Sequence, residues 1–72
     1  MSAARELRVR VNGRDVLLTD GASVAALLES LSVSSPRVAV ERNREIVPKA
    51  AYTTTALAEG DELEVVELVG GG

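Results

Sequence analysis

The sequence predicts a small α+β domain in which one amphipathic helix packs on one face of a mixed β-sheet. Runs of alternating apolar and charged residues, which are typical of half-buried strands, stand on both sides of one stretch with helical periodicity. The pair Asn12-Gly13, which favours a two-residue hairpin turn, joins the first two runs. At 72 residues the chain has room for one hydrophobic core.

The first predicted element is a β-hairpin. Residues 7–11 alternate apolar and charged side chains, and Asn12-Gly13 follows as a type I′ turn. Residues 14–19 then form the returning strand.

A single helix is expected to follow the hairpin. Ser23 is placed to cap its first turn. The helix should end near Ser32, ahead of the Ser34-Ser35-Pro36 loop. Its apolar residues recur at i, i+3, i+4 and i+7, which predicts one buried face made of Val24, Leu27, Leu28 and Leu31.

The second half of the chain predicts three more strands. Residues 38–42 form the first, Asn43-Arg44 a tight turn, and residues 45–47 a short strand that Pro48 closes. Residues 49–57 are interpreted as loop with one helical turn, in which Tyr52 covers the edge of the core.

The last strand is expected over residues 62–69, after a turn at Glu59-Gly60-Asp61. Its alternation puts Leu63 and Val65 on the helix side. Val66 and Leu68 then point away from the helix, where they form a candidate docking patch; cover by local loop structure is the alternative.

The predicted order is β-hairpin, helix, strand, short strand and long strand, abbreviated ββαββ with the short strand left out. A helical crossover allows the first and last strands to pair in parallel. This arrangement is the β-grasp, or ubiquitin-like, architecture, with residues 1–69 as the single domain and residues 70–72 as a glycine tail.

Composition excludes several classes of protein. The chain has no cysteine and no histidine, so disulfides, thiolate metal sites and the commonest general base are absent; no metal site is expected. Hydrophobic residues make up 46% of the chain, but no run is long enough to span a membrane, and residues 1–6 lack a signal-peptide core. We expect a cytoplasmic protein without a membrane partner.

Charge is unevenly distributed along the chain. Residues 1–44 carry seven arginines against five acids, and residues 45–72 carry one lysine against six acids. An acidic chain with one aromatic residue is a poor candidate for binding nucleic acid. The acidic end favours a basic protein partner, and a solvated strand face is the alternative.

Three glycines, Gly70, Gly71 and Gly72, follow the last strand. Without side chains they make a thin tether that reaches about 10 Å and can enter a narrow cleft. The tether would present the carboxylate of Gly72 as a substrate for adenylation by ATP. A frayed end or a cloning remnant would give the same glycines.

Several stretches recur in a characteristic order and spacing: Asn12-Gly13, Gly21-Ala22-Ser23-Val24, Leu27-Leu28, residues 38–43, residues 45–49, Leu57, Glu59-Gly60-Asp61, residues 63–66 and Gly71-Gly72. In the order and spacing of these stretches, the chain resembles the ThiS family of sulfur carriers from residue 7 to residue 72. The family often has glycine where Arg44 follows Asn43, a departure that concerns the turn type.

The resemblance implies a mechanism in which this protein is a co-substrate and not an enzyme. An E1-like adenylating enzyme of the ThiF type would activate the Gly72 carboxylate with ATP. A sulfur donor, ultimately a cysteine desulfurase, would displace AMP and leave a thiocarboxylate. Thiazole synthase of the ThiG type would accept the sulfur for thiamine. Gly70 and Gly71 would give access, and the carrier itself would bind no cofactor.

Two kinds of alternative stay open at this stage. A sister carrier, such as the MoaD-type subunit of molybdopterin synthase, a carrier for cysteine synthesis or a protein-conjugating modifier, would share the chemistry at Gly72. A non-reactive β-grasp interaction module would make the glycines incidental, because a fold alone does not fix function.

Overall fold

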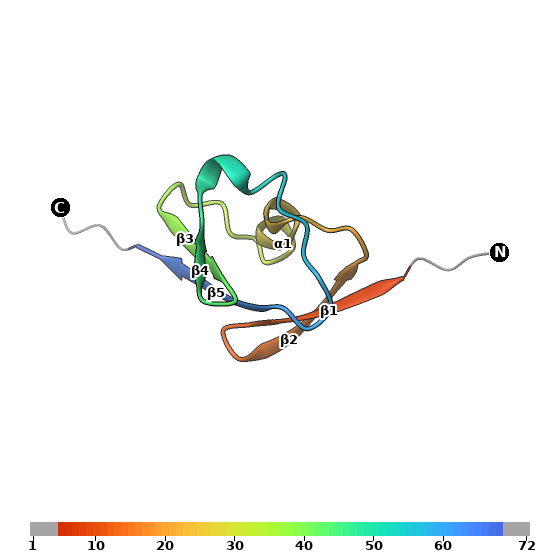
Figure 1. Ribbon diagram of the computed structural model, residues 1–72. Helices are drawn as coiled ribbons and strands as arrows, with labels where there is room; N and C mark the ends of the chain where they lie inside the picture. The colour runs from red at the N-terminus through yellow and green to blue at the C-terminus, as the bar shows by residue number, and fades with distance from the viewer. Residues whose placement is uncertain (1–4, 69–72) are drawn as a thin grey trace.

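The chain opens with the predicted β-hairpin. The computed structural model describes residues 5–68, and in it β1 (Glu6–Val11) and β2 (Arg14–Thr19) pair antiparallel, with Val11 opposite Arg14 (Figure 1). Asn12 and Gly13 have φ angles of 50° and 83°. Because a type I′ turn needs positive φ at both central residues, the predicted turn type is confirmed.

Helix α1 (Val24–Ser30) begins where predicted and ends earlier than predicted. The Ser23 hydroxyl oxygen accepts a hydrogen bond of 3.1 Å from the backbone N–H of Ala26, which confirms the N-cap. Val24, Leu27 and Leu28 are buried.

The prediction that Leu31 shares this buried face is wrong, because Leu31 lies beyond the helix and is exposed. Ser32 takes a φ of 58°, and its N–H donates to the carbonyl of Glu29, while that of Val33 donates to Leu28. These two bonds form a Schellman motif. The motif reverses the chain and packs Val33, instead of Leu31, against the core.

The remaining strands are β3 (Val38–Arg42), β4 (Glu45–Val47) and β5 (Glu62–Glu67), with a 3-10 turn at Lys49–Ala51 between the last two. They join one sheet in the order β2-β1-β5-β3-β4. β1 and β5 pair in parallel and the other neighbours antiparallel. The predicted α+β fold class and the parallel pairing are confirmed. With β4 counted, the full order is ββαβββ. The described strand β5 ends at Glu67, and Val69 lies outside the described residues.

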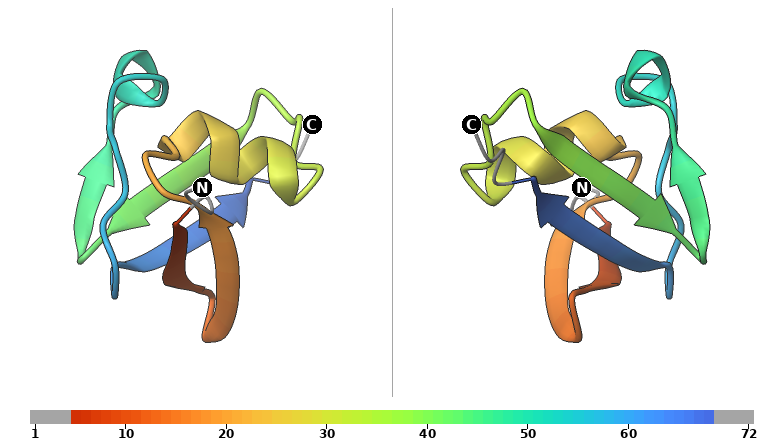
Figure 2. Two further views of the ribbon diagram at one scale, coloured as in Figure 1. Left: turned by 90° about the vertical axis from the view of Figure 1, so that its right-hand side faces the viewer. Right: turned by 90° about the vertical axis from the view of Figure 1, so that its left-hand side faces the viewer.

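The core lies between α1 and one face of the sheet. Figure 2 shows α1 lying across this face, and within residues 5–68 no helix covers the opposite face, which we call the outer face. Tyr52 packs at the edge of the core, as predicted. None of the described helices is long and apolar enough to cross a lipid bilayer. The buried apolar side chains are Leu7, Val9, Val11, Leu18, Val24, Leu27, Leu28, Val38, Val40, Val47, Leu57 and Leu63.

Candidate functional site

The candidate site lies where β5 leaves the sheet. Val66 and Leu68 are 49% and 57% exposed, and their alternation with buried Leu63 places them on the outer face, as predicted. Their role in binding stays a prediction. The predicted reactive residue Gly72 and the tether residues Gly70 and Gly71 lie outside the described residues.

Strand β5, which leads to these residues, is held very differently along its two edges. Along β3 it pairs from Leu63 to Glu67. Hydrogen bonds extend this ladder at both ends, from the Asn43 N–H to the carbonyl of Glu62 (2.7 Å) and from the Leu68 N–H to the carbonyl of Arg37 (2.6 Å). Along β1, β5 makes only two residue pairs, which involve Glu62 and Leu63.

The side chain of Asn12 continues the ladder where β1 ends. Its Nδ2 donates to the carbonyl of Val65 (3.0 Å), and its Oδ1 accepts from the Val65 N–H (2.9 Å). A primary amide can imitate a backbone peptide group in this way, because it carries both a donor and an acceptor. Asn12 therefore replaces one strand residue beside β5.

Asn43, in the other tight turn, holds the opposite edge of β5 at its start. Its Oδ1 accepts from the Glu62 N–H (3.0 Å), and its Nδ2 donates to Oδ1 of Asp61 (3.0 Å). Asn43 has a φ of 51° and Arg44 a φ of 70°, so this turn keeps the type I′ geometry although Arg44 replaces glycine.

Asp61 is the buried anchor of this region. Its Oδ2 accepts from Nε of Arg42 (2.7 Å) and from the Ala58 N–H (2.8 Å). Burial alone would raise the pKa of the Asp61 carboxyl, but the hydrogen bonds from Ala58, Asn43 and Arg42, with the charge of Arg42, hold its pKa below the ordinary value. Asp61 is one of the six acids of residues 45–72 that were expected to favour a basic partner, but it is 6% exposed and serves the fold.

The exposed apolar side chains Ala39, Ile46, Val66 and Leu68 make up what we call the outer patch. Ala39 lies directly opposite Val66 on β3. Ile46, which is 76% exposed on β4, lies opposite Glu41 and therefore diagonal to Ala39. On the same face Glu41 lies opposite Glu64, so carboxylates border the patch on its turn side.

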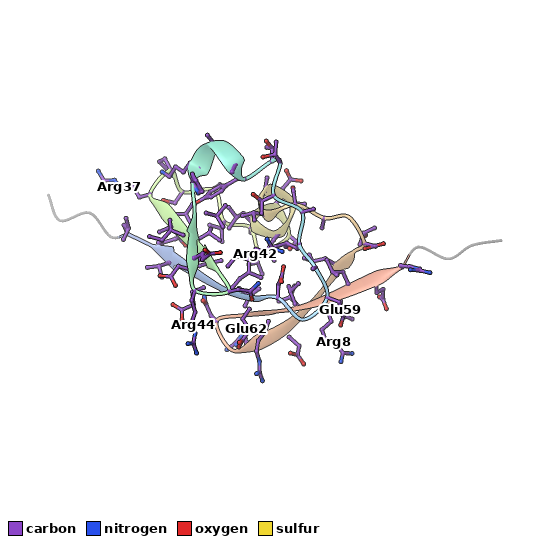
Figure 3. The ribbon with its side chains drawn as sticks, in the orientation of Figure 1. Arg8, Arg37, Arg42, Arg44, Glu59 and Glu62 are labelled. Carbon is purple, nitrogen blue, oxygen red and sulfur yellow. The ribbon has the colours of Figure 1, made fainter. Side chains whose placement is uncertain are left out.

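Beyond these carboxylates, the two tight turns flank a recess of about 480 Å³ on the outer face. Arg10 and Arg44 line it together with Glu41, Glu62 and Glu64. Figure 3 shows Arg44 and Glu62 at this end of the sheet and Arg37 at the other, beside the exit of β5. Within residues 5–68, no group of three or more carboxylates is arranged to hold a metal ion. The recess offers ionic contacts, and neither histidine nor cysteine occurs in the chain to supply a catalytic base or thiolate there.

Comparison with known proteins gives one consistent answer. The family model described as "ThiS family" matches residues 3–72, almost the whole chain. The chain belongs to the ThiS family. Its fold agrees with this assignment: the crystal structure of the thiamine biosynthesis protein ThiS from Geobacter metallireducens superposes with a TM-score of 0.73 at 34% identity, covering 92% of this chain and all of that one.

Two relatives of this ThiS-family chain differ in length. The sulfur carrier protein ThiS of Bacillus subtilis is 38% identical over 89% of this chain and 98% of its own length. A thiazole synthase of Paramagnetospirillum magneticum is 46% identical over 92% of this chain, but the chain spans only about a fifth (20%) of that protein. A ThiS-like segment thus occurs both alone and inside a longer thiazole synthase.

For this member of the ThiS family, sequence reasoning found half of the outer patch and missed the rest. Ala39 and Ile46 were assigned to strands, but no signal in one strand gives its register against another. Asn12 and Asn43 were identified as turn residues, because asparagine tolerates positive φ. Their side-chain bonds to β5 join residues 53 and 19 positions apart, which local patterns do not reveal.

Proposed function

We propose that the protein is a sulfur carrier of thiamine biosynthesis that bears its sulfur on the carboxylate of Gly72. The observation that carries the proposal is the position of β5 at the centre of a ThiS-family fold. Side-chain and backbone bonds fix this strand as far as Leu68, and in the sequence Val69, Gly70, Gly71 and Gly72 come next. A rigid strand that ends in glycines is suited to presenting a carboxylate to another protein's active site.

The proposed chemistry takes place at the carboxyl carbon of Gly72. A ThiF-type enzyme would let the carboxylate attack the α-phosphate of ATP, with pyrophosphate as leaving group. Sulfur that originates from a cysteine desulfurase would then displace AMP from the acyl-adenylate, and a thiocarboxylate would result. The carrier acts as co-substrate in this scheme, and ATP binds to the partner enzyme.

The acceptor in this proposal is a thiazole synthase of the ThiG type. A relative supports this choice of acceptor, because a segment similar to this chain forms about a fifth (20%) of a protein named thiazole synthase. Fusion keeps a donor and its acceptor at high effective concentration. A MoaD-type role would use the same Gly72 chemistry with another acceptor.

The outer patch is the proposed contact surface for the adenylating enzyme. Val66 and Leu68 place apolar area on the strand that leads, through Val69, to the glycines, and Glu41 and Glu64 border it with negative charge. Apolar contacts would supply binding energy, and the carboxylates would favour a partner with basic residues at the rim.

Intact-mass measurement after incubation with ATP, a ThiF-type enzyme and a sulfur source tests the chemistry. We expect a mass gain that corresponds to one oxygen replaced by sulfur, localised to Gly72 by fragmentation. A bulky residue at Gly71 should abolish the gain. No gain with an enzyme that thiolates another ThiS protein would instead favour the non-reactive interaction module.

A second measurement separates docking from chemistry. Val66→Asp should weaken binding to the adenylating enzyme by about tenfold, because a charge would replace buried apolar contact in the complex. Thr53→Asp, in an exposed turn whose neighbour Tyr52 accepts a hydrogen bond from Ala25 of α1 on the helix side of the sheet, is the matched control. Equal affinity of both variants would remove Val66 from the contact surface.

A further inference from the structure

The two edges of the sheet differ in how well they are protected against pairing with another strand. At one edge, β4 has three residues and is followed by Pro48, which has no N–H to donate. Arg42 and Glu45 close its two-residue turn, so the alternation of the ladder leaves Ile46 as the one β4 residue whose backbone groups face outward. This edge is short and blunted.

At the other edge, β2 is six residues long and lies outermost in the sheet (Figure 1). Its register against β1 is uninterrupted from Arg14 to Thr19, so it has no bulge, and it contains neither lysine nor proline. Native proteins usually blunt an edge with such features or with charged side chains, and the charged residues of β2, Arg14 and Asp15, stand together beside the turn. Leu17, in the middle of β2, is 55% exposed.

The alternation of hydrogen bonds between β1 and β2 shows which backbone groups of β2 are free to pair with another strand. Val11 and Arg14 close the two-residue turn, and the Asp20 N–H donates to the carbonyl of Arg5 at the other end of the ladder (2.8 Å). The backbone groups of Asp15, Leu17 and Thr19 therefore point away from β1. Of these, only the Thr19 carbonyl accepts a bond, from the Ala22 N–H, among the backbone bonds of the described residues.

From this edge we infer that two copies of the chain associate through β2, antiparallel, with Leu17 on the two-fold axis. In this register Leu17 would meet Leu17 of the second copy as a hydrogen-bonded pair, and the Thr19 N–H would donate to the carbonyl of Asp15. The two five-stranded sheets would become one continuous sheet. The inference goes beyond the proposed function and does not depend on it.

The charges of β2 complement each other in this register and favour a second copy as the occupant. Centring the pairing on Leu17 puts Arg14 of each copy opposite Asp20 of the other. Both side chains are exposed, and neither makes an ion pair with another residue of the described chain. The half-buried Val16 would meet Leu18 on the helix side, and opposite charges directly across two strands stabilise their pairing.

The dimer would leave the candidate site accessible. β1 separates β2 from β5, and the outer patch lies on β3, β4 and β5. One strand against one strand is a small interface, below the roughly 1,200 Å² typical of stable complexes. We therefore expect a weak dimer in rapid exchange with monomer.

NMR spectra recorded over a concentration series up to millimolar test the inference. We expect concentration-dependent amide shifts confined to residues 14–20, and filtered NOEs between the two copies of Leu17. Leu17→Lys should raise the dimer dissociation constant by at least about tenfold, because it places two like charges on the axis. Ile46→Lys, a change of the same kind on the other edge strand, should leave the constant unchanged.

A charge swap tests the register. Arg14→Asp and Asp20→Arg should each weaken the dimer, whereas the double variant should restore it, because each copy then offers the reversed pair. Shifts that do not change with concentration would overturn the inference. Association mapped to Ala39, Ile46 and Val66 would also overturn it, since the copies would then meet through the outer patch.

Discussion

The two tight turns of this protein have the same backbone geometry and bind the same strand, but different residues support them. Each is a two-residue turn that starts with asparagine and has positive φ at both positions. Each asparagine side chain bonds to β5, Asn12 at Val65 on one edge and Asn43 at Glu62 on the other. In the first turn, glycine follows at no steric cost; in the second, Arg44 is held at a φ of 70°.

The difference between the turns lies in what supports them. Asn12 reaches β5 alone, whereas Asn43 is bound to the buried Asp61, which also holds Arg42. A residue in a strained conformation persists only where its surroundings determine it. We infer that the Asp61 anchor compensates for the strain at Arg44, and that the Asn12 turn needs no anchor because it carries no strain.

Removal of the anchor should have the largest effect. Asp61→Ala leaves the half-buried Arg42 without its partner and frees Asn43, so we expect a loss of about 2–4 kcal/mol in the free energy of unfolding. Urea denaturation measures it. Asp15→Ala, which removes a carboxylate 4.0 Å from Arg10 in an exposed pair, is the control and should cost less than about 0.5 kcal/mol. Equal losses in the two variants would contradict the role of Asp61.

The charge of Asp61 makes part of this stability depend on pH. Its folded-state pKa lies below the ordinary value, so its ionised form stabilises the fold at every pH above the unfolded-state pKa of about 3.9. This contribution disappears as the pH falls through the folded-state pKa. We therefore expect the stability difference between wild type and Asp61→Asn to be constant near neutral pH and to shrink below about pH 4. A difference that grew on acidification would have the wrong sign.

The two side-chain hydrogen bonds of Asn12 should contribute less to the free energy of unfolding, because they lie at an exposed site where water can replace them. Asn12→Gly keeps the positive φ and removes both side-chain bonds to Val65, and we expect it to cost about 1–2 kcal/mol. Hydrogen exchange gives the specific signature: the Val65 amide should lose protection, while the amide of residue 12, whose wild-type N–H donates to the Leu63 carbonyl, should keep its protection. Unchanged exchange at Val65 would show that the side chain does not hold this edge.

The Asn12 bonds to Val65 and the Asp61 anchor also mark the limit of what the sequence predicts. Periodicity and turn preference are local, and they placed the hairpin, the start of α1 and the outward direction of Val66. Leu31 fits the helical period, but the left-handed Ser32 that ends the helix has no strong signal, because serine is not a usual residue at positive φ. Asp61 fits a turn by its type, and its burial depends on Arg42 and Asn43 arriving from β3, a tertiary contact.

The smallest effect should come from exchanging the residues that distinguish the turns. Arg44→Gly removes the left-handed strain and should stabilise the protein by about 0.5–1 kcal/mol, the penalty for a side chain at positive φ less the entropy of glycine. Gly13→Arg is the reverse change, and an added Cβ there meets no atom within 4 Å, so strain alone should destabilise by a similar amount. Thermal unfolding measures both.

If the Asp61 anchor sustains the strain at Arg44, Arg44→Gly should also reduce the cost of Asp61→Ala in a double-mutant cycle. If the changes in unfolding free energy of the two variants simply add, the strain at Arg44 and the anchor at Asp61 are independent. The two turns would then differ in residue type only.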